Sequence, residues 1–374
     1  MISWWIYMKR INYSNLKIII PLLIILIIGI FMVYSSSSIW ANFIYDDKYY
    51  YLKRQTIFVI IGLLLMIILS KIKLSILRKY NNILLLLGFV MLLLVLFIGV
   101  KINGSRSWFK IGSFLLQPSE LFKIFIVIYM ADKLDKYYEI TNSFFKTILI
   151  LLIPSFLGFA LIMAQPDFGS GIVMIGSIIM MCMLSKNKFK YYLIIFICAL
   201  LAFSILIIFS PYRSDRIISF IDPYKDPLGS GFQTIQSLYA IGPGSLIGKG
   251  IDTSYQKYFY LPEPQTDFIF AIFAEDFGFV GCVILIGIYT YLIKAMLDKA
   301  IYENNIFKSF INIGISSLII IQVCINLCVV VGLIPVTGIT LPFLSYGGSS
   351  ITMLLAGVGL ILNKGEINEY SNVR

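Results

Sequence analysis

The stretch Lys17-Ile-Ile-Ile-Pro-Leu-Leu-Ile-Ile-Leu-Ile-Ile-Gly-Ile-Phe-Met-Val-Tyr-Ser-Ser-Ser-Ser38 is long and apolar enough to cross a bilayer as one helix. A spanning helix needs about 20 mostly apolar residues. A secretory signal peptide has a shorter apolar run and a small-x-small cleavage pattern, which is missing here. The sequence therefore predicts a retained membrane helix over 17–38.

Similar stretches recur along the whole chain. Of its 374 residues, 59% are hydrophobic and 13% charged, and the mean hydropathy is +0.90. These values are typical of an integral membrane protein. The other predicted spans are 55–70, 82–100, 118–131, 146–163, 169–184, 189–210, 267–293, 309–331 and 349–363. We expect an all-α, polytopic bundle of about ten transmembrane helices, forming a single domain over 1–374.

The basic residues predict how this bundle is oriented. With the N-terminus inside the cell, the inner segments carry 18 Lys and Arg residues and the longer outer segments carry 11. By the positive-inside rule, both tails, 1–16 and 364–374, should be cytoplasmic. A large external loop, 211–266, should then lie between the seventh and eighth spans. The net charge of +11 fits attraction to anionic lipid headgroups, and nucleic acid is not an expected partner.

The sequence contains no histidine. This absence excludes Ser-His-Asp and Cys-His nucleophile systems, His-ligated zinc and imidazole proton relays. Acid–base chemistry must therefore use carboxylates, lysines or tyrosines.

Asp267 lies where the proline-flanked loop 260–266 meets a strongly apolar run. A carboxylate at the mouth of a spanning helix can remain charged and reactive. A continuous helix would place Glu275 and Asp276 roughly 12–14 Å deeper and on other faces. We expect that pair to hold helices together, with a proton pathway as the alternative.

Other polar groups cluster in the predicted outer segments. Arg213 and Arg216 could grip a phosphate together, or could lie in a solvated loop with acidic partners. Glu120 and Lys123 could form an intrahelical ion pair, or Lys123 could face a cavity that binds an anionic group. Asp167 is expected to cap the sixth span.

Several strings, in consistent order, closely resemble the SEDS family of bacterial membrane proteins, which comprises FtsW, RodA and SpoVE. They look most like the FtsW and SpoVE branch of Gram-positive bacteria. The strings are Asn103–Trp108, Gln117–Lys123, Gln165–Gly169, Asp222–Gln233, Leu261–Asp267 and Gly338–Ser350.

The resemblance implies a peptidoglycan glycosyltransferase that polymerises lipid II at the outer face of the cytoplasmic membrane. The family's essential aspartate corresponds to Asp267, which could act as a general base or hold a divalent cation, Mg or Mn. Substrate-binding positions are expected at Arg106, Gln117, Glu120, Lys123, Arg213, Arg216, Gln265 and Ser345. The chain departs from many members at Ser107, where a second basic residue is common, and at Glu275-Asp-Phe-Gly278.

The expected mechanism is a single displacement that releases undecaprenyl pyrophosphate. The expected partner is a class B penicillin-binding protein, together with other division, elongation or sporulation wall-synthesis proteins. Two alternatives remain at this stage: a flippase or transporter of lipid-linked precursors, and a scaffold that activates the penicillin-binding protein.

Overall fold

The structure is a computed structural model that describes residues 2–102, 104–112, 114–136, 148–185, 220–229, 231–251 and 253–364. The predicted seventh span, 189–210, lies outside the described residues. The described helices are α1 (Ile2–Tyr45), α2 (Tyr50–Lys71), α3 (Leu74–Ile98), α4 (Pro118–Lys136), α6 (Ile153–Ala164), α7 (Phe168–Met183), α10 (Phe232–Ile241), α11 (Ile269–Ile301), α12 (Ile306–Val330) and α13 (Gly348–Leu362). A π-helical turn, Ile148–Leu152, leads into α6. The short 3₁₀ turns Pro223–Lys225 and Gly242–Gly244 flank α10.

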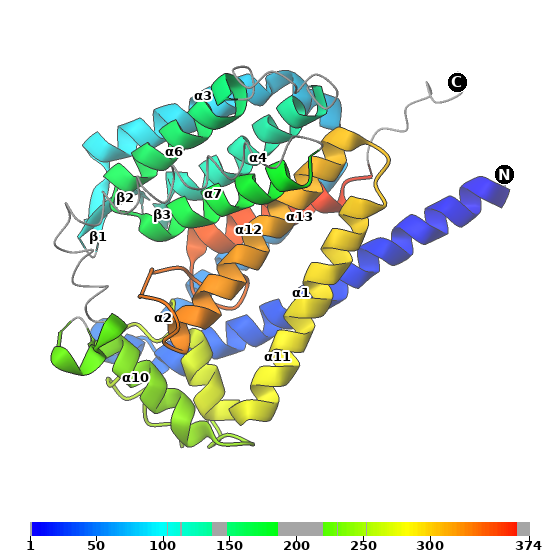
Figure 1. Ribbon diagram of the computed structural model, residues 1–374. Helices are drawn as coiled ribbons and strands as arrows, with labels where there is room; N and C mark the ends of the chain where they lie inside the picture. The colour runs from blue at the N-terminus through cyan, green and yellow to red at the C-terminus, as the bar shows by residue number, and fades with distance from the viewer. Residues whose placement is uncertain are drawn as a thin grey trace.

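This arrangement confirms the predicted helical bundle (Figure 1). Five described helices are long and apolar enough to cross a membrane: α1 from Ser14, α2, α3, α11 and α12. α6, α7 and α13 are shorter apolar helices. α1 is also longer than the expected 17–38 span, because residues on both sides continue the helix.

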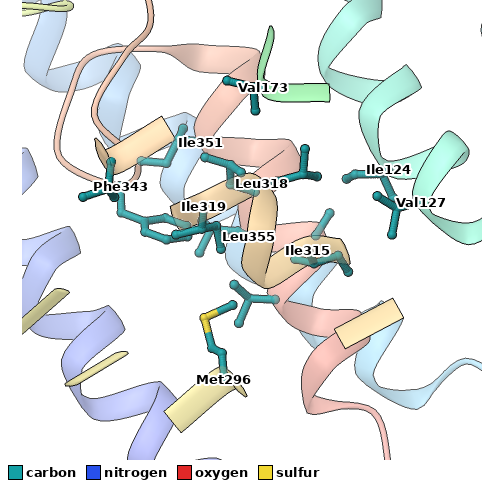
Figure 2. Close-up of a cluster of buried hydrophobic side chains, with 14 of the residues drawn as sticks. Ile124, Val127, Val173, Met296, Ile315, Leu318, Ile319, Phe343, Ile351 and Leu355 are labelled. Atoms are coloured by element: carbon teal, nitrogen blue, oxygen red, sulfur yellow. The ribbon is translucent and has the colours of Figure 1, made fainter. Parts of the chain in front are cut away.

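α12 lies at the centre of the bundle. It packs against α4, α7, α10, α11 and α13. In Figure 2 its side chains Ile315, Leu318 and Ile319 lie among apolar residues from several elements. Those neighbours are Ile124 and Val127 of α4, Val173 of α7, Met296 of α11, Ile351 and Leu355 of α13, and Phe343. Because α12 is enclosed by protein, its polar side chains meet other parts of the chain rather than lipid.

The bundle has two chemically different ends. At the first, called here the basic end, Asn363 donates to the carbonyls of Leu69 and Ile72 at 2.9 and 2.7 Å. There, too, Lys299 donates to Asn15. At the opposite end, called the loop end, Gln55 of α2 donates to Ser345 O at 3.0 Å. Among the described residues, the α2–α3 connection and the end of α13 thus meet at one end of the bundle, and the start of α2 and the loop before α13 meet at the other.

A small sheet covers part of the loop end, where the sequence suggested only a loop. β1 (Val100–Ile102), β2 (Ser105–Ile111) and β3 (Phe114–Leu116) form an antiparallel sheet in the order β1-β2-β3. Phe114 packs edge-on against Phe58 of α2. Ser105 and Ser107 both donate to Gln165 O, at 2.6 and 2.8 Å. The sheet therefore ties the α3–α4 connection to α2 and to the turn before α7.

The predicted span over 267–293 corresponds to α11, a candidate membrane span that is broken at one point. α11 begins at Ile269 and breaks at Gly278, whose φ of 65° and ψ of −166° are not helical. Figure 1 shows the short first arm and the long second arm meeting at a sharp bend. The break lies beyond Glu275 and Asp276, which belong to the short first arm, so it does not change the predicted spacing of roughly 12–14 Å from Asp267 along the helix axis.

The preceding loop satisfies the backbone groups at this break. Gly250 N donates to Asp276 O at 3.0 Å, Lys249 N to Glu275 O at 2.9 Å, and Phe279 N to Ser245 O at 2.9 Å. Irregular backbone in a membrane protein is tolerated where other protein groups meet its hydrogen-bonding needs. The break is thus a built feature that depends on residues about 30 positions earlier in the chain.

Candidate functional site

Asp267 lies half-buried in the turn that leads into α11. Its carboxylate accepts a hydrogen bond from the Thr266 hydroxyl at 2.7 Å. Its carbonyl accepts one from the Asn326 amide of α12, also at 2.7 Å, and the same amide donates to Ile339 O at 2.7 Å. One buried side chain of the central helix therefore holds the Asp267 turn and the loop before α13 together.

The loop before α13 makes a second connection to this turn. Tyr346 N donates to Gln265 O at 2.8 Å. Ser345, expected to bind substrate, accepts from Leu341 N through its hydroxyl at 2.8 Å. Its carbonyl accepts from Gln55, so α2 takes part as well. The strings that contain Gln265 and Ser345 are therefore neighbours in space, although 80 residues separate these two positions in the sequence.

Asp167 is the centre of a second polar cluster at the loop end. It caps α7 by accepting from Ser170 N at 3.2 Å. Its other carboxylate oxygen accepts from Gln117 at 2.6 Å and from Ser119 at 2.9 Å. The structure thus joins two of the strings singled out in the sequence, and Gln117 contacts the capping residue.

Glu120 and Lys123 form an ion pair of 2.7 Å inside α4. Both are almost fully buried, at 5% and 2% exposure. Of the two alternatives for this pair, the structure therefore has the intrahelical ion pair. Glu120 Oε2 has no hydrogen-bond partner among the described residues. An unsatisfied carboxylate oxygen in a buried position is costly, which leaves a donor from substrate or water as a suitable complement.

The two clusters lie against the same loop. A Cβ atom at Gly169, in the first turn of α7, would lie 2.5 Å from Ile339 Cγ1 and 2.9 Å from Thr337 O. Ile339 O is the carbonyl that Asn326 holds together with the Asp267 turn. The loop over 332–347 therefore bridges the Asp167 cluster and Asp267.

The predicted cations are placed differently from one another. Arg106 donates to Leu96 O and Phe97 O, at 3.1 and 3.4 Å, and so satisfies carbonyls at the end of α3. Ser107 is buried and lies in the sheet contact with Gln165 O. Arg213 and Arg216 lie outside the described residues, so their phosphate-binding role stays a prediction.

Glu275 and Asp276 hold the external loop to the bundle. Glu275 accepts from Tyr255 N and Gln256 N at 2.8 and 3.3 Å. Asp276 pairs with Lys257 at 2.6 Å, and Lys257 also donates to Ser35 of α1 at 2.7 Å. The pair was expected to hold helices together, and these contacts join the external loop to α11.

No group of three or more His, Cys, Asp or Glu side chains suited to a metal ion occurs in the part of the chain that the structure describes. The described residues thus offer Asp267 without a set of further carboxylate ligands. They do not form a complete Mg or Mn site.

Sequence reasoning missed several contributors to this site. Asn326 and Gln55 contact the key strings but lie within or beside apolar spans. Asparagine and glutamine inside predicted spans could have indicated these contacts, because polar groups at membrane depth require hydrogen-bond partners. Arg54, one position before Gln55, had counted only as a basic loop residue.

The profile of a family described as "Cell cycle protein", covering FtsW, RodA and SpoVE, matches residues 15–370. The chain belongs to the FtsW/RodA/SpoVE family. One relative is stage V sporulation protein E of Bacillus subtilis (strain 168), 43% identical over 358 residues, which cover 95% of this chain and 98% of the relative. Another is the probable peptidoglycan glycosyltransferase FtsW of Geobacter sp. (strain M18), 36% identical over 362 residues, covering 95% and 98%.

Solved structures of FtsW/RodA/SpoVE proteins share the fold. A chain from a structure titled "Structural coordination of polymerization and crosslinking by a peptidoglycan synthase complex" aligns with a TM-score of 0.74 and 30% identity, covering 92% of this chain and 95% of that one. RodA of Thermus thermophilus aligns with a TM-score of 0.69 and 26% identity, covering 93% and 95%. The bundle is thus a family architecture, and the chain is a multi-pass membrane protein.

Proposed function

We propose that the chain is a peptidoglycan glycosyltransferase that polymerises lipid II at the outer face of the cytoplasmic membrane. The observation that carries this proposal is the half-buried Asp267 carboxylate, fixed at the loop end by α12 and by the loop before α13. Relatives that match nearly the whole chain are named as probable peptidoglycan glycosyltransferases. Division, elongation and sporulation are all compatible settings.

In the proposed reaction, Asp267 acts as the general base. It takes the proton from the 4-hydroxyl of the acceptor sugar while that oxygen bonds to the anomeric carbon of the donor. The bond from that carbon to the pyrophosphate oxygen breaks, and its electron pair leaves with undecaprenyl pyrophosphate. One displacement inverts the anomeric centre. The Thr266 hydroxyl, which donates to the carboxylate, orients it for this transfer.

The test is Asp267→Asn in the purified full chain with labelled lipid II. We expect polymerisation to fall about 10²–10⁴-fold, the usual effect of removing a positioned base. Asp47→Asn is the matched control, because Asp47 is a carboxylate of the α1–α2 connection paired with Lys53. It should polymerise at the unmutated rate. An Asp267→Asn protein that is folded and polymerises normally contradicts the assignment.

The transporter alternative gains little from the structure. A broken helix is a feature of many transporters, and α11 is broken beside two carboxylates. However, both carboxylates already have partners in the external loop: Glu275 accepts from the backbone of Tyr255 and Gln256, and Asp276 pairs with Lys257. Reconstituted vesicles separate the two functions, since a synthase forms polymer from lipid II presented on the side of the loop end.

A class B penicillin-binding protein is the proposed partner, and it would cross-link the new glycan. One solved structural relative comes from a peptidoglycan synthase complex, as its title states. The proposal of a scaffold role is compatible with enzymatic activity, because the same bundle could bind the partner and polymerise the glycan.

A further inference from the structure

Arg54 is a half-buried cation at the loop end for which no role has been assigned. Its guanidinium lies over the ring of Tyr50, 4.4 Å from the ring centroid. Among the ion pairs of the described residues, none includes Arg54. The neighbouring Lys53, in contrast, is largely exposed and pairs with Asp47.

Arg54 lies close to the reactive segment in space. The next residue of α2, Gln55, donates to Ser345 O, and Tyr346 donates its backbone N–H to Gln265 O, two positions before Asp267. The Tyr346 ring also packs edge-on against Tyr51 of α2, with centroids 4.9 Å apart. Arg54 therefore lies on the part of α2 that contacts the loop joined to the Asp267 turn.

Unpartnered polar atoms lie on the same side. Gln55 and Gln265 are 0% and 2% exposed, and Oε1 of each has no hydrogen-bond partner among the described residues. Buried amide oxygens normally accept a hydrogen bond, and leaving such an oxygen without one costs roughly 1–3 kcal/mol. One of these acceptors belongs to the residue next to Arg54 and the other to the Asp267 segment, and a ligand with an anionic group and hydroxyl donors would complete them.

The other expected cations are less available for an anion. Arg106 is bonded to the carbonyls that end α3, and Lys123 is paired with Glu120. A guanidinium suits a phosphate because its planar fork can donate two parallel hydrogen bonds. The aromatic ring beneath Arg54 adds a low-dielectric wall that strengthens such a contact.

We propose that Arg54 binds the diphosphate of a lipid-linked saccharide, with the Gln265 amide oxygen accepting a hydroxyl of the attached sugar. This subsite rests on the proposed function, since it supplies the positive charge that a departing pyrophosphate needs. Its position on α2 means that charge and base reach the substrate from different helices.

Binding without turnover tests the subsite directly. The probe is labelled undecaprenyl pyrophosphate, bound to the purified full chain in detergent, with undecaprenyl phosphate and phosphatidylglycerol as competitors. Arg54→Gln should weaken pyrophosphate binding about 10–100-fold, as expected for losing a charged hydrogen-bond pair. Arg54→Lys should recover part of the loss, and the control Lys53→Gln should bind normally.

Tyr346→Phe provides a second variant that keeps the charge. It removes a phenol hydroxyl from the loop that α2 contacts and should weaken binding less than Arg54→Gln does. Unchanged pyrophosphate binding in a folded Arg54→Gln protein would overturn the proposal. Equal competition by phosphatidylglycerol would also overturn it, because the site would then recognise a phospholipid headgroup rather than a lipid-linked diphosphate.

The Asp267→Asn variant separates this proposal from the proposed function. It should bind pyrophosphate normally while polymerising poorly, whereas Arg54→Gln should raise KM for lipid II and lose pyrophosphate binding. If Asp267→Asn polymerises normally but Arg54→Gln still loses binding, the base assignment fails and the subsite stands. If only Asp267→Asn shows its expected defect, the subsite fails and the base assignment stands.

Discussion

Lys257 is a buried cation that joins three parts of the molecule. Its ammonium group pairs with Asp276 at 2.6 Å and donates to Ser35 of α1 and to Ile251 O. Lys257 and Asp276 are 4% and 2% exposed. Removing one member of a buried pair leaves a charge in a poorly solvated place, whereas removing both does not.

Lys257→Met should therefore destabilise the protein by about 3–5 kcal/mol. The measurement is unfolding in detergent, followed by the intrinsic fluorescence of the full chain. The double variant Lys257→Met with Asp276→Leu is the matched control and should recover most of the loss. A single variant as stable as the parent would show that the pair does not hold the external loop.

At the scale of elements, the bend in α11 depends on glycine. Gly278 has a positive φ, and a Cβ atom there would overlap the backbone of Ile247 and Gly248. L-residues with side chains adopt such a conformation only with strain, and the close approach leaves no room to relax. The short arm of α11 is thus held in place by a contact between two backbones.

Gly278→Ala should cost more than about 1 kcal/mol of stability, since it adds both strain and overlap. Gly287→Ala is the control: Gly287 lies in the long arm of α11, where a Cβ atom would meet nothing within 4 Å. That change should be neutral or stabilise by roughly 0.5–1 kcal/mol. Thermal unfolding of the two purified variants gives the comparison, and equal midpoints would contradict it.

The sequence predicted the helices well because the length of a single apolar stretch is enough to identify a spanning helix. Asp267 and the Asp167 cap were recognisable for a similar reason, since each adjoins the start of such a run. The bend at Gly278 was not predictable, because it requires Gly248 and its neighbours to fold back onto it. The use of Arg106 at the end of α3 likewise depends on a sheet that three short strands form.

At the scale of the whole molecule, bundle assembly relies on large side chains seated against glycine. Phe122 of α4 is fully buried. It contacts Phe89 of α3 at 5.0 Å between centroids, and Cβ atoms at Gly88 or Gly158 would collide with its ring. One aromatic side chain therefore sets how closely α3, α4 and α6 approach.

Gly158→Val should destabilise the bundle by about 1–3 kcal/mol through overpacking. Combining it with Phe122→Leu should cost less than the sum of the two single changes, because the smaller side chain makes room. A double-mutant cycle on unfolding free energies measures the coupling. Strict additivity would show that the ring and the glycine do not meet.

The Asn326 hydrogen bonds have a consequence for how such proteins can vary. Asn326 of α12 binds the carbonyls of Asp267 and Ile339. The central helix therefore fixes the position of the Asp267 carboxylate. From the preceding external segment, Thr266 also holds the carboxylate. Relatives could therefore lengthen, shorten or recharge the earlier part of that segment to suit different partners, and the reactive group would remain in the same place.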